Sequence, residues 1–383
     1  MRIVIAPDKF KGSLPAAEVA AALAAGLRDA LGAAELIMIP VADGGDGTVD
    51  AAVAAGFARV PVTAAGPTGE PVAASYARRG DLALVELATV CGLERLPGGR
   101  LEPLASSSYG AGQVIRAALA AGARELVLAV GGSASTDGGA GMLQALGAQV
   151  LGARGEPLGR GGGALADVTT LDLTGLVGSG LVGSGLDPAA REARITLAVD
   201  VQNPLTGPDG AAAVFGPQKG ATPEQVAQLD GALRRWAGLV AGVTGRDWSQ
   251  APGAGAAGGV GFAALAVLGA QRRSGIEMIL DLVGFDAALD GADLVVTGEG
   301  SLDTQSLAGK APIGVARAAA ARGIPVVAVP GRSTLTPEQA REAGITAIHP
   351  LTGLEPDLAR SMAGAASLLA RIARDQLASW TRA

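Results

Sequence analysis

The sequence contains a single cysteine, Cys91, and a single histidine, His349. One cysteine excludes an internal disulfide and any metal site built from several cysteines. One histidine argues against Ser-His-Asp hydrolysis and against histidine-rich metal sites. We expect Cys91, within ELATVCGLE, to be a small apolar core residue, and His349, before Pro350, to be structural. Acid–base chemistry in this chain would then depend on carboxylates and lysines.

Aromatic residues, long apolar runs and basic stripes are also scarce or missing. Only 3% of the 383 residues are aromatic although 49% are hydrophobic, so we expect a core of small aliphatic side chains. No apolar stretch reaches the roughly 18 residues of a membrane span, and RIVIAP near the N-terminus does not resemble a signal peptide. The net charge of −6, with no basic stripe, argues against a nucleic-acid partner. The sequence predicts a cytoplasmic protein without a membrane partner, and it leaves a homo-oligomer open.

Glycine is abundant, with 59 residues, and it clusters where apolar runs end. Three segments share this pattern: IMIPVADGGDGTVD, LVLAVGGSASTDGGAG and LVVTGEGSLDTQSLAGK. A strand that enters a glycine-rich turn before a helix directs backbone N–H groups toward the positive end of the helix dipole. That arrangement binds phosphate, and the neighbouring acids offer ligands for a divalent cation. The pattern therefore predicts an enzyme that handles phosphate.

Apolar strands alternate with alanine-rich helices, which indicates an α/β fold with parallel sheets covered by helices. We predict strands at residues 2–6, 35–40, 125–130, 195–199, 292–296 and 324–329, and helices at 14–31, 48–56, 106–121, 223–243 and 311–322. Ser13 and Thr222 are the expected N-caps of two of these helices. Residues 59–90 should be rich in β-structure, and residues 250–261 should form a flexible connector. The repeated LVGSG at 176–185 is expected to carry no function.

The strands nearest the two termini have a similar composition, so both ends of the chain can form one domain around an inserted one. We predict two different α/β domains. Residues 1–61 plus 291–383 form the first, and residues 62–290 form the second, inserted domain.

Acidic residues follow five of the predicted strands within a few positions: Asp8, Asp43, Asp137, Asp200 and Glu299. Ligands of open parallel sheets bind at the carboxyl ends of the strands. A single acid at such a place is as often a helix cap or a turn residue. Five acids at one edge favour a binding site.

Two segments suggest anion sites, each with a structural alternative. In DKFKGS, Lys9 or Lys11 could hold a small carboxylate or phosphate, or the segment could be a solvated turn capped by Ser13. In DGGDGT, the glycines Gly44, Gly45 and Gly47 let the backbone approach a ligand, or they serve only a tight turn.

The segment GGSASTDGG, residues 131–139, combines small hydroxyl residues with backbone amides and is the best candidate for nucleotide phosphates. Two literal G-x-G-x-x-G matches, beginning at Gly178 and Gly253, follow no convincing strand and are rejected as dinucleotide sites. A Walker A motif is also excluded, because Gly309-Lys310 is followed by Ala311.

Nearly the whole chain is similar to the type I glycerate kinase family. The matching segments are IAPDKFKGSL, PVADGGDGT, ELATVCGLE, SSSYGAGQVI, VGGSASTDGGAGM, DVQNPLTGPDGAAAVFGPQKGA, GAGAAGGVGF and ADLVVTGEGSLDTQSLAGKAPIGVA. The resemblance implies two α/β domains, one inserted into the other, with the active site in the cleft between them. It also implies ATP-dependent phosphorylation of D-glycerate to 2-phosphoglycerate. Ser135 and Ser106–Ser108 stand where family members often carry threonine, which keeps a hydroxyl at each position.

Within that resemblance we assign roles to the motif residues. Lys11, with Lys9, should neutralise the carboxylate of glycerate, and Asp200 should be the catalytic base. Phosphoryl transfer depends mostly on positioning and on charge neutralisation by Mg²⁺. The substrate-binding candidates are Asp8, Lys9, Asp43, Gly44, Gly45, Asp46, Gly47, Thr48 and Asn203. The nucleotide-binding candidates are Gly131, Gly132, Ser133, Thr136, Asp137 and Gly138. The Mg²⁺ ligands expected are Glu299 and Asp303.

Three alternatives stay open. The first is a kinase that phosphorylates C3 and gives 3-phosphoglycerate, because nothing in the residues decides between the two hydroxyls. The second is a phosphatase using the same acids. The third is a non-catalytic sugar-acid-binding protein on the same scaffold.

Overall fold

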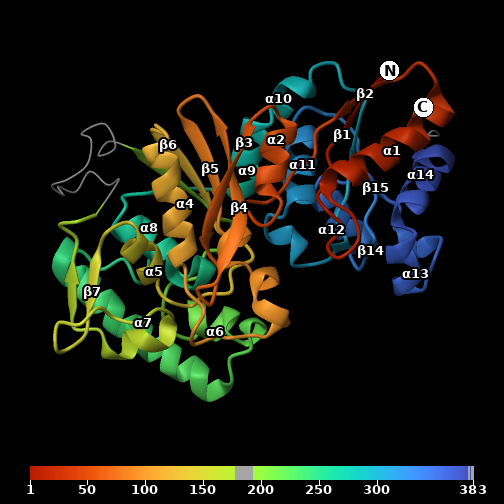
Figure 1. Ribbon diagram of the computed structural model, residues 1–383. Helices are drawn as coiled ribbons and strands as arrows, with labels where there is room; N and C mark the ends of the chain where they lie inside the picture. The colour runs from red at the N-terminus through yellow and green to blue at the C-terminus, as the bar shows by residue number, and fades with distance from the viewer. Residues whose placement is uncertain (177–192, 378–379, 381–383) are drawn as a thin grey trace. The chain divides into compact units, whose positions relative to one another are not determined.

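The computed structural model describes residues 1–176, 193–377 and 380, and the repeat that begins at Leu176 lies almost entirely outside them (Figure 1). The chain forms two compact units. Unit 1 comprises residues 1–43, 50–56 and 274–383, and unit 2 comprises residues 44–49 and 57–273. These limits differ from the boundaries near residues 62 and 290 suggested by the sequence. The strand at 58–65 pairs within the sheet of unit 2, and the helices at 275–282 and 285–288 pack into the core of unit 1.

Unit 1 is built on a five-stranded sheet of the described residues in which every pairing is parallel. Its order is β15-β13-β11-β1-β2, with β1 Arg2–Ile5, β2 Glu35–Met38, β11 Leu294–Thr297, β13 Val326–Ala328 and β15 Ala347–Ile348. β12 Ser301–Leu302 and β14 Arg332–Ser333 form a separate small parallel sheet.

Helices cover both faces of this sheet. Alternate residues of β1 belong to different cores, since Ile3 and Ile5 pack with α1 and α14, whereas Val4 packs with α9, α10 and α11. The helices of unit 1 are α1 Ala16–Leu31, α2 Thr48–Ala54, α9 Gly275–Leu282, α10 Phe285–Ala288, α11 Ala311–Ala320, α12 Pro337–Glu342, α13 Leu358–Ala363 and α14 Ala365–Asp375, with α2 beginning in the segment of unit 2. Gly26 lets α1 approach α14 closely, because a Cβ there would lie 2.0 Å from the Ala370 carbonyl oxygen.

Unit 2 contains a six-stranded mixed sheet in the order β10-β9-β6-β5-β4-β3. Strands β5, β6, β9 and β10 run parallel, and β3 and β4 add an antiparallel edge. The bounds are β3 Ala58–Ala65, β4 Pro71–Arg79, β5 Leu82–Glu86, β6 Glu125–Ala129, β9 Arg194–Ala198 and β10 Gln271–Arg273, with a separate hairpin of β7 Gln149–Leu151 and β8 Thr170–Asp172. The predicted β-rich segment at 59–90 is confirmed.

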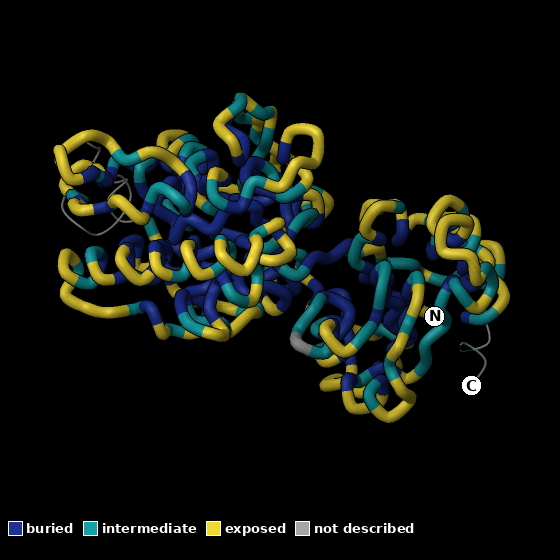
Figure 2. The backbone as a smooth tube through the Cα atoms, turned by 90° about the horizontal axis from the view of Figure 1, so that it is seen from below, coloured by how far each residue is buried: buried dark blue, intermediate teal, exposed yellow. Residues whose placement is uncertain are grey.

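One continuous hydrophobic core joins this sheet to the helices of unit 2. The helices are α3 Ala88–Cys91, α4 Tyr109–Ala120, α5 Ala140–Ala145, α6 Ala211–Phe215, α7 Pro223–Thr244 and α8 Val260–Ala266. Thr222 caps α7 in a capping box with Gln225, as predicted. The central strands β1, β5, β6, β11 and β13 are mostly buried, whereas the edge strands β2, β3 and β10 are largely exposed or half-buried. Figure 2 shows buried backbone in the interior of each unit and exposed backbone on the outside. The mixed α/β class is confirmed.

Two local predictions are wrong. Ser13 does not cap α1, whose N-cap is Pro15; its hydroxyl donates instead to the Met362 carbonyl. Residues 250–261 are not a flexible connector, since most of 253–261 is buried. Gly258 has φ +63°, and a Cβ there would lie 2.0 Å from the Ser135 carbonyl oxygen. The glycines of this segment permit close backbone packing rather than mobility.

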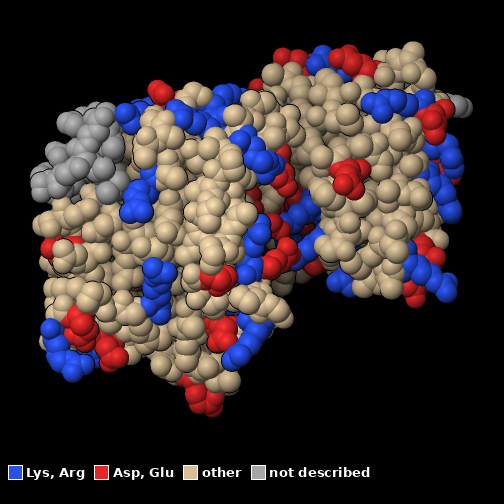
Figure 3. All heavy atoms as spheres, viewed as in Figure 1, with Lys and Arg blue, Asp and Glu red and all other residues tan. Residues whose placement is uncertain are grey.

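Among the described residues, no helix combines the length and the apolar character that crossing a membrane requires. On the face shown in Figure 3, lysines and arginines are interspersed with aspartates and glutamates.

Candidate active site

A pocket of about 370 Å³ opens within unit 1. Three carboxylates line it, from Asp8, Asp43 and Glu299, and four cationic side chains, from Lys9, Lys11, Lys310 and Arg332. Apolar side chains from the C-terminal part of the chain complete its wall. Unit 1 therefore combines both charge signs and an apolar surface in one cavity.

The parallel sheet brings the three acids of this pocket together. Asp8 follows β1, Asp43 follows β2 and Glu299 follows β11, and these strands are neighbours in the order β11-β1-β2. Their carboxyl ends consequently meet at one edge of the sheet. The Asp8 backbone N–H donates to the Gly298 carbonyl at 2.8 Å, which joins the turn after β1 to the turn after β11.

The environment of these acids disfavours ionisation. Burial raises the pKa of Asp8 well above its usual value, and the nearby Asp43 carboxylate raises it further. Burial also raises the pKa of Glu299, against the opposing effects of the Ser306 hydroxyl and the Lys310 ammonium. Carboxylates gathered in this way are suited to a cation or to the hydroxyl groups of a ligand.

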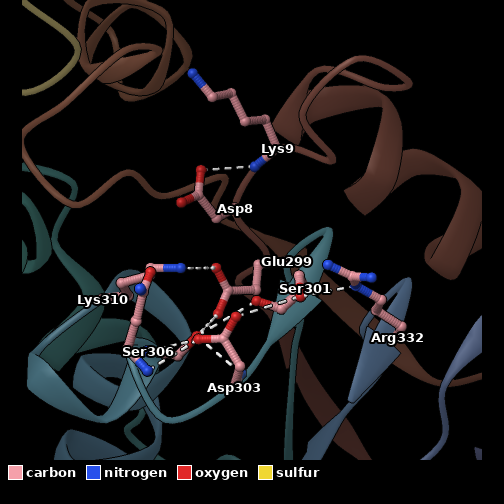
Figure 4. Close-up of polar contacts among 9 residues, drawn as sticks. Asp8, Lys9, Glu299, Ser301, Asp303, Ser306, Lys310 and Arg332 are labelled. Atoms are coloured by element: carbon pink, nitrogen blue, oxygen red, sulfur yellow. Dashed lines mark hydrogen bonds and ion pairs between the residues drawn. The ribbon is translucent and has the colours of Figure 1, made fainter. Parts of the chain in front are cut away.

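Glu299 is the centre of a hydrogen-bonded network (Figure 4). One carboxylate oxygen accepts from the Ser306 hydroxyl, and the other lies 3.5 Å from the Lys310 Nζ. Asp303 closes the turn below, because its Oδ1 accepts from the backbone N–H groups of Gln305, at 2.9 Å, and of Ser306, at 3.3 Å. The two predicted Mg²⁺ ligands, Glu299 and Asp303, thus both bind Ser306. The Asp303 carboxylate, however, already accepts hydrogen bonds from backbone N–H groups of its own turn.

The cations of the pocket are held differently. Arg332 donates from Nε to the Ser301 hydroxyl at 3.1 Å, which orients the guanidinium on β14. The Lys9 backbone N–H donates to the Asp8 carboxylate at 2.6 Å, while its side chain extends away from that carboxylate in Figure 4. Lys310 is the N-cap residue of α11.

The other two predicted acids belong to unit 2, so the five acids do not share one edge. Asp137 follows β6 and Asp200 follows β9, which are neighbours in the sheet of unit 2. The sequence shows an acid after each strand in both units, but only the strand pairing shows which of these acids belong to the same sheet. The Asn203 side chain, in the loop after Asp200, donates to the Asp209 carbonyl at 2.9 Å.

The segment Gly44–Thr48 is held by a residue that the sequence analysis did not select. The carboxylate of Glu86, at the end of β5 and 3% exposed, accepts from the Gly47 N–H at 3.1 Å and from the Val49 N–H at 2.8 Å. Thr48 donates from its hydroxyl to the Gly45 carbonyl. One of the amides expected to hold a ligand, that of Gly47, is therefore bound to Glu86. Its position in ELATVCGLE, directly after an apolar strand, was the available signal.

The loop at 131–138 contacts the glycine loop at 44–47. A Cβ on Gly131 would lie 2.5 Å from the Gly45 Cα, so only glycine permits this approach. Asp137 is buried, and its carboxylate accepts from the hydroxyl and N–H of Ser108, the hydroxyl of Ser107, and two backbone N–H groups of its own loop. Asp137 thus organises the loop from inside. Thr136 is also fully buried, and its Oγ1 has no hydrogen-bond partner among the described residues.

A buried lysine supports the same loop. Lys219 is 3% exposed and its ammonium donates to the Ser135 carbonyl at 2.5 Å. Burial lowers the pKa of Lys219 to about 7, although the Asp137 carboxylate opposes this effect. The sequence analysis noted the surrounding GPQKG only as part of the resemblance, because a lysine in a polar loop gives no sign of burial.

The remaining sequence predictions concern metals and the rare side chains. Among the described residues, no group of three or more His, Cys, Asp or Glu side chains is arranged to hold a metal ion by itself. Cys91 is fully buried, and burial raises the pKa of its thiol to about 12, as suits an apolar core residue. Burial lowers the pKa of His349, and its Nε2 has no hydrogen-bond partner among the described residues.

Fold and site together define an α/β protein with a charged pocket at the carboxyl ends of parallel strands. The sequence model of the glycerate kinase family matches residues 3–381. The chain is 41% identical to a glycerate kinase of Bacillus subtilis, covering 99% of this chain and 97% of the relative. It is also 41% identical to the glycerate 2-kinase of Escherichia coli, over 98% of this chain and 97% of the relative.

A solved structure agrees with these relatives. It is a crystal structure described as that of a glycerate kinase 2 of Salmonella typhimurium LT2, with a TM-score of 0.82 and 42% identity, covering 100% of this chain and 98% of the other. The chain belongs to the glycerate kinase family. It is an enzyme, a kinase of this family.

Proposed function

We propose that this enzyme transfers the γ-phosphoryl group of ATP to the C2 hydroxyl of D-glycerate, giving 2-phosphoglycerate. The observation that carries the proposal is the unit 1 pocket, in which Asp8, Asp43 and Glu299 lie with four cationic side chains at one sheet edge. Glycerate offers a carboxylate for the cations and hydroxyls for the acids. The similarity to the glycerate 2-kinase of Escherichia coli favours C2 over C3.

The pocket residues divide by chemistry. Lys11 and Lys9 would neutralise the glycerate carboxylate, since a lysine ammonium acts as a compact point charge. Asp8 and Asp43 would accept hydrogen bonds from the hydroxyls and so orient the acceptor. The loops at 44–48 and 131–133 stay candidates for contacts with the substrate, apart from the Gly47 N–H, which Glu86 binds, and the Gly131 N–H, which donates to the Gly44 carbonyl.

Magnesium would be supplied with the nucleotide. The carboxylates of the pocket are the oxygen ligands that Mg²⁺ prefers, and a divalent cation would relieve the repulsion that Asp8, Asp43 and Glu299 exert on one another. Glu299 would hold the ion directly and Asp303 through water, because the Asp303 carboxylate is used by its turn. Bound there, Mg²⁺ would neutralise charge on the transferring phosphoryl group.

Of the proposed roles, the general base is the one that the pocket geometry assigns least firmly to a residue. Asp200 is the candidate from the sequence, but it is not among the residues that line the unit 1 pocket, whereas Asp8 and Asp43 are. Loss of a general base lowers kcat by about 10²–10⁴-fold. We expect Asp200→Asn to lower kcat within that range. If Asp200→Asn retains turnover while Asp8→Asn or Asp43→Asn loses it, the base lies in the pocket instead.

The test of the overall function is a product analysis. The purified protein is incubated with ATP, Mg²⁺ and D-glycerate, and the products are identified by ³¹P NMR against 2- and 3-phosphoglycerate standards. A 2-phosphoglycerate signal supports the proposal. A 3-phosphoglycerate signal reverses the orientation of the acceptor, and ADP release without glycerate would indicate a hydrolase. Omitting glycerate or ATP provides the controls.

A further inference from the structure

The unit 1 pocket has an apolar wall, for which glycerate, a three-carbon acid with a carboxylate and two hydroxyls, offers little apolar surface. Leu351, Leu358 and Met362 contribute to this wall. Leu358 is 52% exposed and Met362 37% exposed, although residues of this kind are usually buried. Exposed apolar side chains beside a polar rim are typical of ligand-binding grooves. Pockets of roughly 300–1,000 Å³ accommodate ligands much larger than glycerate.

We infer that this apolar wall binds the purine base of a nucleoside triphosphate whose phosphates lie against Lys310 and Arg332. The inference rests on the proposed kinase function and assigns its nucleotide to unit 1. It replaces the assignment of the nucleotide to the loop at 131–138.

The wall is preformed. The Ser13 hydroxyl donates to the Met362 carbonyl at 2.6 Å, which ties α13 to the turn after β1. The Met362 Cε packs against Gly12, where a Cβ would lie 3.2 Å from it. A methionine side chain adapts readily to the flat face of a base. A wall fixed in this way loses little conformational entropy when the base binds.

The cations of the pocket complement a triphosphate. Arg332 is oriented by its bond to Ser301, and a guanidinium matches the geometry of phosphate oxygens. Lys310 precedes α11, a helix over Ala311–Ala320, so the positive end of the helix dipole lies next to the ammonium. Two cations and a helix N-terminus in a pocket with an apolar wall fit a ligand that is apolar at one end and highly anionic at the other.

The loop at 131–141 is poorly suited to phosphate because many of its donors are already used. Within 131–138, the N–H groups of Gly131, Ala134 and Gly138 donate to the carbonyls of Gly44, Cys91 and Gly258. Further along the chain, the N–H groups of Gly139 and Gly141, at the start of α5, donate to the Asp137 carboxylate. The buried Asp137 carboxylate would also repel an anion. The glycines and hydroxyls that predict a phosphate loop from sequence serve internal packing here.

Photolabelling of the full-length wild-type protein with 8-azido-ATP distinguishes the two locations. Peptide mapping by mass spectrometry should place the label within residues 351–365, and excess ADP should prevent it. Label confined to residues 131–141 would overturn the inference. Measuring glycerate phosphorylation on the same preparation separates the two claims: a protein that labels at 351–365 but does not phosphorylate glycerate retains the nucleotide site and loses the proposed function.

A pair of variants tests the wall itself. Met362→Trp should fill the space for the base and weaken binding of the fluorescent analogue mant-ADP by about tenfold or more. Met38→Trp, at an exposed methionine on β2 that does not line the pocket, should change it by less than about twofold. Inorganic tripolyphosphate, which lacks a base, should bind both variants as it binds the wild type.

Two results would contradict the inference. One is unchanged mant-ADP binding by a Met362→Trp protein with wild-type circular dichroism. The other is a change in oligomeric state on light scattering, without a change in nucleotide binding, which would show that a second copy of the chain covers the wall.

Discussion

Replacing the buried lysine of unit 2 with methionine should make the protein more stable, and more so in acid than in base. Lys219 has a pKa of about 7 in the folded protein, against 10.5 for an ordinary lysine. At about 1.4 kcal/mol per pH unit, this difference amounts to about 5 kcal/mol. The unfolded chain keeps the proton up to about pH 10.5, whereas the folded protein releases it above about pH 7.

The sign of the pH dependence follows from these two values. Below about pH 7 both states carry the proton, and the folded state bears the full cost of burying the charge. As the pH rises above 7, the unfolded state binds more protons, so the wild type becomes more stable. At pH 9 the remaining cost is about 2 kcal/mol. A variant without the ammonium has neither the cost nor this pH dependence.

Lys219→Met also removes the bond to the Ser135 carbonyl, and leaving that buried acceptor unpaired costs about 1–3 kcal/mol. The variant should therefore exceed the wild type by about 2–4 kcal/mol at pH 6 and differ little from it at pH 9.

The assay is urea unfolding at pH 6 and pH 9, followed by tryptophan fluorescence in a Trp380→Phe background, so that the signal comes from unit 2. Trp236 is fully buried there and donates from Nε1 to the Gly138 carbonyl at 3.0 Å, beside the loop in question. Arg235→Met, on the exposed side of α7, controls for the loss of a cation. A Lys219→Met protein that is destabilised equally at both pH values would refute the reasoning.

Three further outcomes are expected. Glu86→Ala removes the acceptor of two backbone N–H groups in the 44–49 loop and should lower the free energy of unfolding by about 2–4 kcal/mol in urea titrations; a value near zero would mean that water replaces the carboxylate. Gly258→Ala should destabilise by more than about 2 kcal/mol, because its φ is +63° and its Cβ would lie 2.0 Å from the Ser135 carbonyl oxygen, whereas Gly231→Ala, in open space on α7, should stabilise by about 0.5–1 kcal/mol in thermal melts. Excess EDTA should abolish phosphorylation and added Mg²⁺ should restore it; turnover that persists in EDTA would exclude a required divalent cation.

Local features of the fold were predictable because they depend on neighbouring residues. The strands at 2–6 and 125–130 and the helix at 223–243 follow from apolar runs and from the Thr222 cap, and the structure has each within a residue or two. Ser13 shows the limit of this reasoning. Its hydroxyl could cap a helix by sequence, but the chain places it 2.6 Å from the Met362 carbonyl, 349 residues away.

The sequence predicted which residues could form the candidate site, but not which of them lie together. The sequence supplied the chemistry of Asp8, Asp43 and Glu299, since strand-end acids favour the carboxyl edge of a parallel sheet. The sequence did not identify Glu86 or Lys219 as functional. Their roles depend on burial among segments that are distant in the chain, and the neighbouring residues do not indicate that burial. The sequence also suggested phosphate binding for the loop at 131–138, where the fold uses the N–H groups of Gly131, Ala134 and Gly138 internally.

By itself, the sequence determined the α/β class, the strand–glycine–helix units and the kinase family, because periodicity, turn residues and long motifs are properties of contiguous chain. Only the tertiary structure decided which strands are neighbours. That pairing placed Asp8, Asp43 and Glu299 at one edge in unit 1 and Asp137 and Asp200 in unit 2. It also brought Leu358 and Met362 from the end of the chain into the pocket with Lys11 from its start. The physical reason is that hydrogen bonds and apolar contacts between residues hundreds of positions apart depend on the whole fold and not on the spacing of any one motif.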